Sequence, residues 1–360
     1  MKTQSIPHLA THPGEILNDE LQARGIAQKE FARDIDLKPT ILNEIIKGKR
    51  SITADTALLL ESGLDIPAKF LMDFQTQYEL DLARIKEKNQ HKLAQTEQWK
   101  VIKEYIPVNY LQKRSYLGNS LAENINRLKR VFCFSTLDEL IQKFSNQKMA
   151  LERYKKSEKL KIDEKNIFCW NYLAKYHANE QQIGQYQPEK VEQVVLELNT
   201  VFYENKNTVT KAETILKQAG IKFVVQEKLD KTPVDGMAFW SDQNPAIAIT
   251  LRKKNIDNLA FTIMHELGHV KLHLKPEDEQ EILDLDNQSN SQIEDEANDF
   301  ARKALIPETI WYEVKHSIPT DVHILHASKK YKIHPHILIG RKCWETGNFA
   351  FKTSIEKHIN

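Results

Sequence analysis

Apolar residues at three- and four-residue spacing divide the first 85 residues into five short segments, and each segment predicts a helix. The first helix begins at Pro13, places Ile16, Leu17 and Leu21 on one face, and ends at Gly25. The other four are expected over residues 28–34, 39–47, 57–64 and 67–85. The pattern therefore predicts an N-terminal five-helix domain over residues 1–85.

The pattern of predicted secondary structure changes twice along the chain after this domain. Residues 86–207 contain few glycines and carry amphipathic runs at 137–144, 170–177 and 191–203, which predicts a mostly helical connecting region. The elements expected after residue 208 are a helix at 211–219, a β run at 221–225, a hairpin from 237–240 and 246–251, and helices at 258–274 and 292–305. The expected fold class is mostly α, with an α+β part and a small β-sheet over residues 208–360.

An acidic segment separates the last two of these helices. Its carboxylates are Glu277, Asp278, Glu279, Glu281, Asp284 and Asp286. The segment lacks the ligand spacing and the glycine of an EF-hand calcium loop. We therefore expect a solvated loop here.

Charge is distributed unevenly along the chain. The formal net charge is +1, but residues 1–85 sum to −3, residues 86–165 to +8 and residues 166–360 to −4. The near-neutral total excludes a chain that coats nucleic acid along its whole length, because such binding needs many basic contacts. A small basic patch that binds DNA remains compatible with these sums.

Other features limit the class and compartment of the protein. No apolar run approaches the roughly 18 residues of a membrane span, and the first residues lack the apolar core of a secretory signal. Cys133, Cys169 and Cys343 are scattered and form no CxxC pair, which excludes a thiolate metal site and indicates a reducing compartment. We therefore expect a cytoplasmic protein with no membrane partner.

The strongest chemical signal is the run HELGH at residues 265–269. His265 and His269 are four residues apart in an expected helix, so both imidazoles can bind one metal ion. Glu266 lies one residue round and can reach a water on the metal without being a ligand. In such an arrangement the metal acidifies the water and Glu266 takes its proton, which is the chemistry of a zinc-dependent endopeptidase.

A catalytic zinc ion usually has three protein ligands and one open position, so a third ligand is needed. The helix at 292–305 offers Glu294 and Glu296 as alternatives. Glu294 is preferred, because Asn298 follows it one turn later and can accept the distal N–H of a ligand histidine. Glu296 would face about 200° round the helix and stays open as the alternative. His273 is expected to be a packing or substrate-side residue.

The surrounding residues resemble the ImmA/IrrE family of metallopeptidases over roughly residues 210–310. The resemblance is carried by FTIMHELGHVKLH at 261–273, ExxANxFAxxxLIP at 294–307, DG at 235–236 and NPxI at 244–247. It implies a zincin-like domain that cleaves a DNA-binding repressor. It also implies His265, His269 and Glu294 as zinc ligands, one Zn²⁺ per chain, and Glu266 as the catalytic residue.

The second and third predicted helices have the length of a helix-turn-helix, whose second helix enters the major groove N-terminus first. Lys38, Thr40, Asn43 and Lys47 would lie along its exposed side. Asn43 can read adenine, and Thr40 can contact a base or a thymine methyl. The residues better placed for phosphates are Lys47, Lys49, Arg50 and Gln28.

Residues 8–85 resemble the HigA-type antidote branch of the XRE regulators, which implies a lambda-repressor-like domain. The residues that carry the resemblance are HPGEIL at 12–17, QxxFA at 28–32 and IIxGKRSIT at 45–53. Such proteins bind operator DNA as homodimers and neutralise a partner toxin. The family often has glycine in the turn where this chain has Asp36, and aspartate tolerates the left-handed region better than most residues.

Two functions from different classes follow from these motifs. In the first, a DNA-binding regulator carries a zinc peptidase that cleaves a repressor-like protein or its own linker after Ile85. In the second, the chain is a non-catalytic antitoxin and autorepressor, whose zinc domain is a sensor or docks a cognate toxin. A weaker third reading is a DNA-bound sensor in which metal occupancy controls operator affinity. The basic residues 86–165 are a candidate contact for DNA backbone or toxin, although an ordinary solvated helical surface is favoured.

Overall fold

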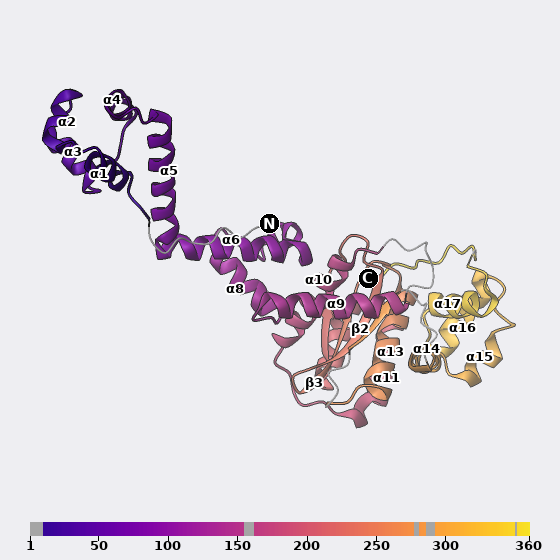
Figure 1. Cartoon of the computed structure of the whole chain (residues 1–360). Helices are drawn as coiled ribbons and strands as arrows, with labels where there is room; N and C mark the ends of the chain where they lie inside the picture. Colours follow the sequence, from indigo (N-terminus) through magenta and orange to yellow (C-terminus); the bar gives the residue numbers. More distant parts are fainter. Residues whose placement is uncertain (1–9, 155–161, 277–280, 286–291, 350) are drawn as a thin grey trace. The chain divides into compact units, whose positions relative to one another are not determined.

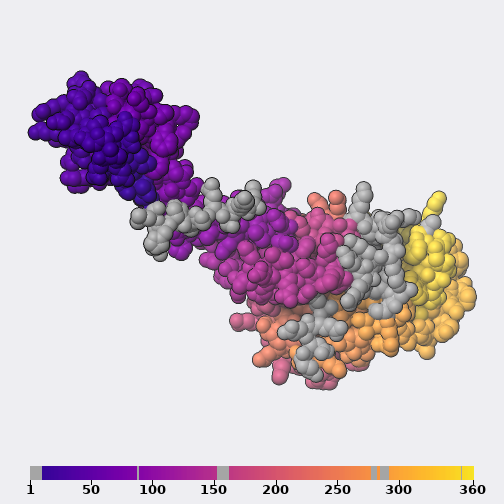
Figure 2. Space-filling view, in the orientation of Figure 1, coloured from indigo at the N-terminus to yellow at the C-terminus, as the bar shows by residue number. Residues whose placement is uncertain are grey.

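The computed structural model of the chain (Figure 1) describes residues 10–154, 162–276, 281–285, 292–349 and 351–360. The chain divides into two compact units, Met1–Lys100 and Val101–Asn360. Figure 2 shows the chain in space-filling form, with the first unit in indigo to violet. Among the described residues, no helix is both long and apolar enough to cross a membrane.

The first unit is built from helices, as the apolar spacing predicted. They are α1 (Pro13–Ala23), α2 (Gln28–Asp34), α3 (Pro39–Ile46), α4 (Ala54–Leu64) and α5 (Ala68–Ile85), and α6 (Glu87–Tyr105) crosses into the second unit. Their apolar faces meet in one core, whose fully buried residues include Leu17, Leu42, Ile45, Leu60 and Leu64. The five helices predicted for this part of the chain are therefore confirmed.

Local interactions explain two motifs of this unit. His12 caps α1, because its Nδ1 accepts a hydrogen bond from the Gly14 backbone N–H at 2.9 Å. A Cβ at Gly14 would lie 2.0 Å from the Ile45 carbonyl oxygen, so only glycine lets α1 approach the end of α3 this closely. Between α2 and α3, Asp36 has φ 54°, which is the left-handed conformation expected for the turn.

The second unit surrounds a small β-sheet with helices. Its first helices are α7 (Val108–Lys113), α8 (Leu121–Val131), α9 (Leu137–Tyr154), α10 (Glu164–Asn179), a 3-10 turn (Pro188–Lys190), α11 (Val191–Glu204) and α12 (Thr208–Gln218). The strands are β1 (Lys222–Val225), β2 (Val234–Ser241), β3 (Asn244–Ile249) and β4 (Glu281–Leu285). The remaining helices are α13 (Ile256–Leu272), α14 (Gln292–Leu305), α15 (Glu308–Val314), α16 (Asp321–Tyr331) and α17 (Pro335–Thr346). The helical middle and the α+β end are as predicted.

The sheet has the strand order β1-β3-β2-β4, with β1 parallel to β3 and the other pairs antiparallel. Helix α13 packs on β2 and β3, against the face that carries Phe223, Ala238 and Ile247. Strand β3 is buried at every position, so both faces of the sheet are covered. Helix α14 packs beside α13, and this pair of helices positions the site described below.

The prediction of a solvated loop between α13 and α14 is wrong for residues 281–285. They form β4, which pairs with β2 and places Ile282 in the core. The acidic composition gave no sign of this strand, because its pairing partner lies more than 40 residues earlier in the sequence. The other acidic residues assigned to the loop, Glu277, Asp278, Glu279 and Asp286, lie outside the described residues.

Candidate metal centre

A glycine contact brings the two helices of the site together. A Cβ at Gly268 on α13 would lie 3.0 Å from Phe300 Cδ1 and 3.3 Å from Ala297 Cα on α14. These distances are tighter than ordinary van der Waals contact, so a larger residue would push the helices apart. The glycine of HELGH therefore permits the close approach that carries Glu294 toward the two histidines.

Three buried side chains converge between α13 and α14. His265 Nε2 lies 3.0 Å from His269 Nε2, 3.3 Å separates His265 Nε2 from Glu294 Oε2, and 3.5 Å separates His269 Nε2 from Glu294 Oε1. Tetrahedral ligands at about 2.1 Å from a zinc ion are about 3.4 Å apart. The donor set His₂Glu and its spacing therefore fit a zinc ion with one position left for water or substrate.

The electrostatics of the three groups suit a divalent cation. Burial alone would raise the pKa of Glu294, but its close contacts with the His265 and His269 rings outweigh it and hold that pKa at about 2. Burial lowers the pKa of His269, so its imidazole is neutral at pH 7. A carboxylate and neutral imidazoles are the protonation states that metal ligation requires.

Glu266 lies beside the ligands and is held against the sheet. Its side chain is fully buried (0 % exposed), and a Cβ at Gly236 on β2 would lie 2.2 Å from its Oε1. Only glycine leaves room for the carboxylate at this point of β2. Local sequence patterns could not predict this contact, because it joins residues 30 positions apart.

Two polar residues of α14 contact the far sides of the histidines. Asn298 Oδ1 lies 3.1 Å from His265 Nδ1, which is the place expected for it. Glu296 is 44 % exposed and lies on His273, with its Oε2 3.0 Å from His273 Nε2. The structure thus places Glu294, and not Glu296, beside the two HELGH histidines. His273 in turn lies on His269, with 3.0 Å between their Nδ1 atoms.

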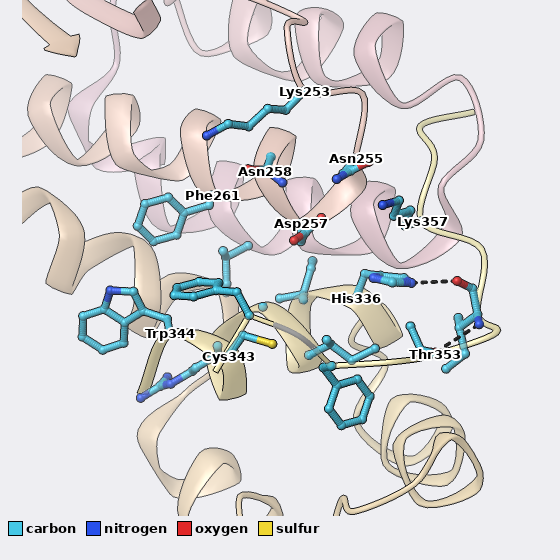
Figure 3. Close-up of a pocket in the computed structure, with 18 of the residues that line it drawn as sticks. Lys253, Asn255, Asp257, Asn258, Phe261, His336, Cys343, Trp344, Thr353 and Lys357 are labelled. Carbon is cyan, nitrogen blue, oxygen red and sulfur yellow. Dashed lines mark hydrogen bonds between the residues drawn. The ribbon is translucent and has the colours of Figure 1, made fainter. Parts of the chain in front are cut away.

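A cavity of about 890 Å³, lined by residues of α13, α14 and α17 among others, lies near the metal centre (Figure 3). Asn298 lies in its wall, as does Phe261, whose ring stacks on His265 at 6.1 Å between centroids. Asp257 from α13 and Trp344 from α17 face the same space. Burial raises the pKa of Asp257. Sequence reasoning missed this cavity, because its walls come from α13, α14, α17 and residues 351–358, which are distant in the sequence.

The residues predicted to contact DNA lie on α2, on α3 and in the turns that flank α3. Those that the structure leaves exposed are Lys38, Thr40, Asn43, Lys47, Lys49 and Arg50. Gln28 is half-buried and donates through Nε2 to Asn18 Oδ1 at 3.1 Å. Arg50 pairs with Glu44 at 2.7 Å, which offsets the only carboxylate of the 38–50 segment.

Two family models match the chain. The model described as "Helix-turn-helix" matches residues 17–71, and the model described as "IrrE N-terminal-like domain" matches residues 216–337. Both matched ranges contain residues discussed above. The second range holds α13, α14 and the whole sheet.

Individual proteins match a smaller part of the chain. Virulence-associated protein I of Dichelobacter nodosus is 40% identical over 75 residues, which cover 21% of this chain and 69% of that protein. The structure of the antitoxin HigA with the higBA promoter, from Pseudomonas aeruginosa, is 35% identical over 23% of this chain and 90% of that chain, with a TM-score of 0.22. An addiction module antidote of the HigA family from Coxiella burnetii is 28% identical over 27% of this chain and 95% of that chain, with a TM-score of 0.20.

Proposed function

We propose a function from the premise that this chain belongs to the XRE-type helix-turn-helix family and carries an IrrE N-terminal-like peptidase domain. The chain is a DNA-binding regulator with a zinc-dependent endopeptidase centre. Its substrate is a regulatory protein, either a separate repressor or the chain itself. The proposed organisation is a DNA-binding domain over 1–85, a helical connection over 86–207 and a peptidase domain over 208–360. The observation that carries the peptidase is the buried triangle of His265, His269 and Glu294 next to Glu266.

Operator binding rests on the exposed side of α3. Asn43, one turn inside α3, offers an amide donor and acceptor to an adenine, and Thr40 precedes it on the first turn. Lys47 and Lys49 follow where α3 ends and approach the phosphates. The Glu44 carboxylate is paired with Arg50, so it repels the DNA backbone less than a free carboxylate would. Binding of the operator by a homodimer of this chain is part of the proposal.

The peptidase chemistry assigns a distinct task to each buried group. A zinc ion held by His265, His269 and Glu294 would act as a Lewis acid that polarises the scissile carbonyl and lowers the pKa of water. Glu266 accepts the proton of the attacking water and delivers it to the leaving amine. Its position against Gly236 fixes the carboxylate for both transfers. Asn298 orients His265 through the 3.1 Å contact with Nδ1.

The neighbouring cavity supplies room for a substrate side chain. Because Phe261 and Asn298 touch both the cavity and His265, a peptide lying over the metal centre can insert one bulky residue there. Self-cleavage after Ile85 has a structural opening as well. Lys86 is the single non-helical residue between α5 and α6, so the chain is interrupted at this one point. Cleavage there still requires the adjoining helical turns to unwind into an extended strand.

A second function is suggested by the likeness of the first unit to antitoxins of the HigA family. In it the chain neutralises a cognate toxin and represses its own operator, and the metal domain serves as docking scaffold or sensor without turnover. The intact Glu266 favours the enzyme, since a purely structural metal site has no use for a general base beside it. The two functions separate in a Glu266→Gln variant, because neutralisation by docking would survive this change.

Metal analysis and proteolysis test the proposal together. Purified protein is expected to hold about one zinc ion per chain, and His265→Ala or Glu294→Gln to lose it. Asp295→Asn, an exposed neighbour on α14, is the matched control and should keep the metal. Glu266→Gln should keep the metal yet abolish cleavage of a quenched fluorescent peptide library and of the chain itself. Retained metal in Glu294→Gln or unchanged cleavage in Glu266→Gln would contradict the assignment.

A further inference from the structure

A row of three side chains leads from the metal centre to the protein surface. His269 Nδ1 lies 3.0 Å from His273 Nδ1, and His273 Nε2 lies 3.0 Å from Glu296 Oε2. His273 directly follows the last residue of α13 and its side chain is 8 % exposed, whereas Glu296 on α14 is 44 % exposed. The row therefore joins the two helices and ends in solvent.

The hydrogen positions along this row follow from the chemistry of its members. A carboxylate only accepts hydrogen bonds, so His273 carries its hydrogen on Nε2 and donates it to Glu296. A neutral His273 then has a bare Nδ1, which can only accept. His269 must therefore carry its hydrogen on Nδ1, and its Nε2 presents a lone pair to the space between His265 and Glu294. That Nε2 is the atom 3.5 Å from Glu294 Oε1.

We propose that Glu296 and His273 are positioning residues that fix the tautomer and ring orientation of His269 for metal binding. The inference rests on the proposed zinc centre. The remote carboxylate acts through His273 and makes His269 a stronger electron donor to the metal than a ring with a free Nδ1–H. This role differs from direct ligation of the metal, which was the alternative that stayed open for Glu296 in the sequence.

The two ligand histidines are supported unequally. His265 has a neutral amide behind it, Asn298 Oδ1 at 3.1 Å, whereas His269 has an imidazole backed by a carboxylate. The second arrangement carries a negative charge toward the metal and should bind it more tightly. Gln292 Nε2 donates to the other oxygen of Glu296 at 2.7 Å, which holds the carboxylate in place on α14.

Zinc affinity and the tautomer of His269 can be measured without any peptidase assay. Chelator competition on the full chain should show zinc affinity about 10- to 100-fold weaker in Glu296→Ala and in His273→Phe. Glu296→Gln keeps an oxygen acceptor for His273 and should show a smaller loss. The exposed neighbour Asp295→Ala is the matched control and should bind zinc as the wild type does.

Two spectroscopic measurements distinguish positioning from a purely structural contact between α13 and α14. In metal-free protein with ¹⁵N-labelled histidine, His269 should be the Nδ1–H tautomer, and Glu296→Ala should shift it toward a mixture. The visible absorption bands of the Co²⁺-substituted chain should also shift in Glu296→Ala and stay unchanged in Asp295→Ala.

Three results would overturn the inference. The first is wild-type zinc affinity in both Glu296→Ala and His273→Phe. The second is an Nε2–H tautomer of His269 in the wild type. The third is a Glu296→Gln variant that loses as much zinc affinity and as much melting temperature as Glu296→Ala. A wild-type chain that binds no zinc would instead refute the proposed peptidase centre. Zinc binding and proteolysis that are unchanged in Glu296→Ala would refute this inference alone.

Discussion

Replacing Gly236 with alanine tests the contact that fixes the catalytic carboxylate. The added Cβ would lie 2.2 Å from Glu266 Oε1 and 2.8 Å from its Cδ. Nonbonded heavy atoms rest at about 3.5 Å from each other, so the carboxylate or strand β2 has to move by about 1 Å. Glu266 is fully buried, and such a movement must therefore displace its packed neighbours on α13.

The size of the effect follows from this displacement. Overpacking of a close-packed interior costs about 1–3 kcal/mol, and a 1 Å displacement of a catalytic group costs about 100-fold in rate. Gly236→Ala should therefore lower the free energy of unfolding by about 1–3 kcal/mol and the cleavage rate about 100-fold. Zinc content should stay unchanged, because the three atoms nearest to the added Cβ all belong to Glu266, which is not a metal ligand.

Three assays on one preparation check the expectation. They are zinc content by mass spectrometry, urea denaturation followed by circular dichroism, and cleavage of the peptide library. Gly184→Ala is the matched control, because a Cβ there meets no heavy atom within 4 Å. If Gly236→Ala unfolds and cleaves like the wild type, the close approach of β2 to Glu266 does not exist in solution.

Three further predictions concern DNA reading and acid stability. Asn43→Ala should weaken binding to a specific operator by about 1–3 kcal/mol and spare non-specific binding, whereas Lys49→Ala should weaken both; equal losses in Asn43→Ala would contradict base reading. Burial lowers the pKa of His12, whose Nδ1 must stay unprotonated to cap α1. The first unit should therefore lose stability as the pH falls below about 6.5. In urea titrations at several pH values, His12→Asn should remove that dependence. Burial also lowers the pKa of His334 to about 4. The free energy of unfolding of the second unit should therefore fall by up to about 1.4 kcal/mol per pH unit between pH 6.5 and 4. His334→Asn keeps a cap for α17 and should flatten this loss, and an unchanged pH profile would show that His334 is not the group responsible.

The elements that the sequence predicted are those built from short-range interactions. The five helices of the first unit follow from apolar spacing within each segment, and Asp36 adopts the left-handed turn because its own side chain tolerates it. The hairpin of β2 and β3 has the same local origin. Strand β4 was missed, since its only signal is pairing with a strand more than 40 residues away.

The candidate site shows the same division. Four-residue spacing on one helix is enough to place His265 and His269 together, and one further position places Glu266 beside them. The choice between Glu294 and Glu296 depends on how α14 is rotated against α13, where Gly268 permits the close approach of Phe300. No periodicity within α14 contains that rotation.

By itself, then, the sequence determined the helix-turn-helix, the HELGH pair and the kinds of residue available to each, because these depend on helical repeat and side-chain chemistry. Only the tertiary structure decided that Gly236 backs Glu266, that His273 and Glu296 stand behind His269, and that a cavity opens next to His265. Each of these joins segments distant in the sequence, and the packing of α13 against β2, α14 and α17 alone brings them within contact.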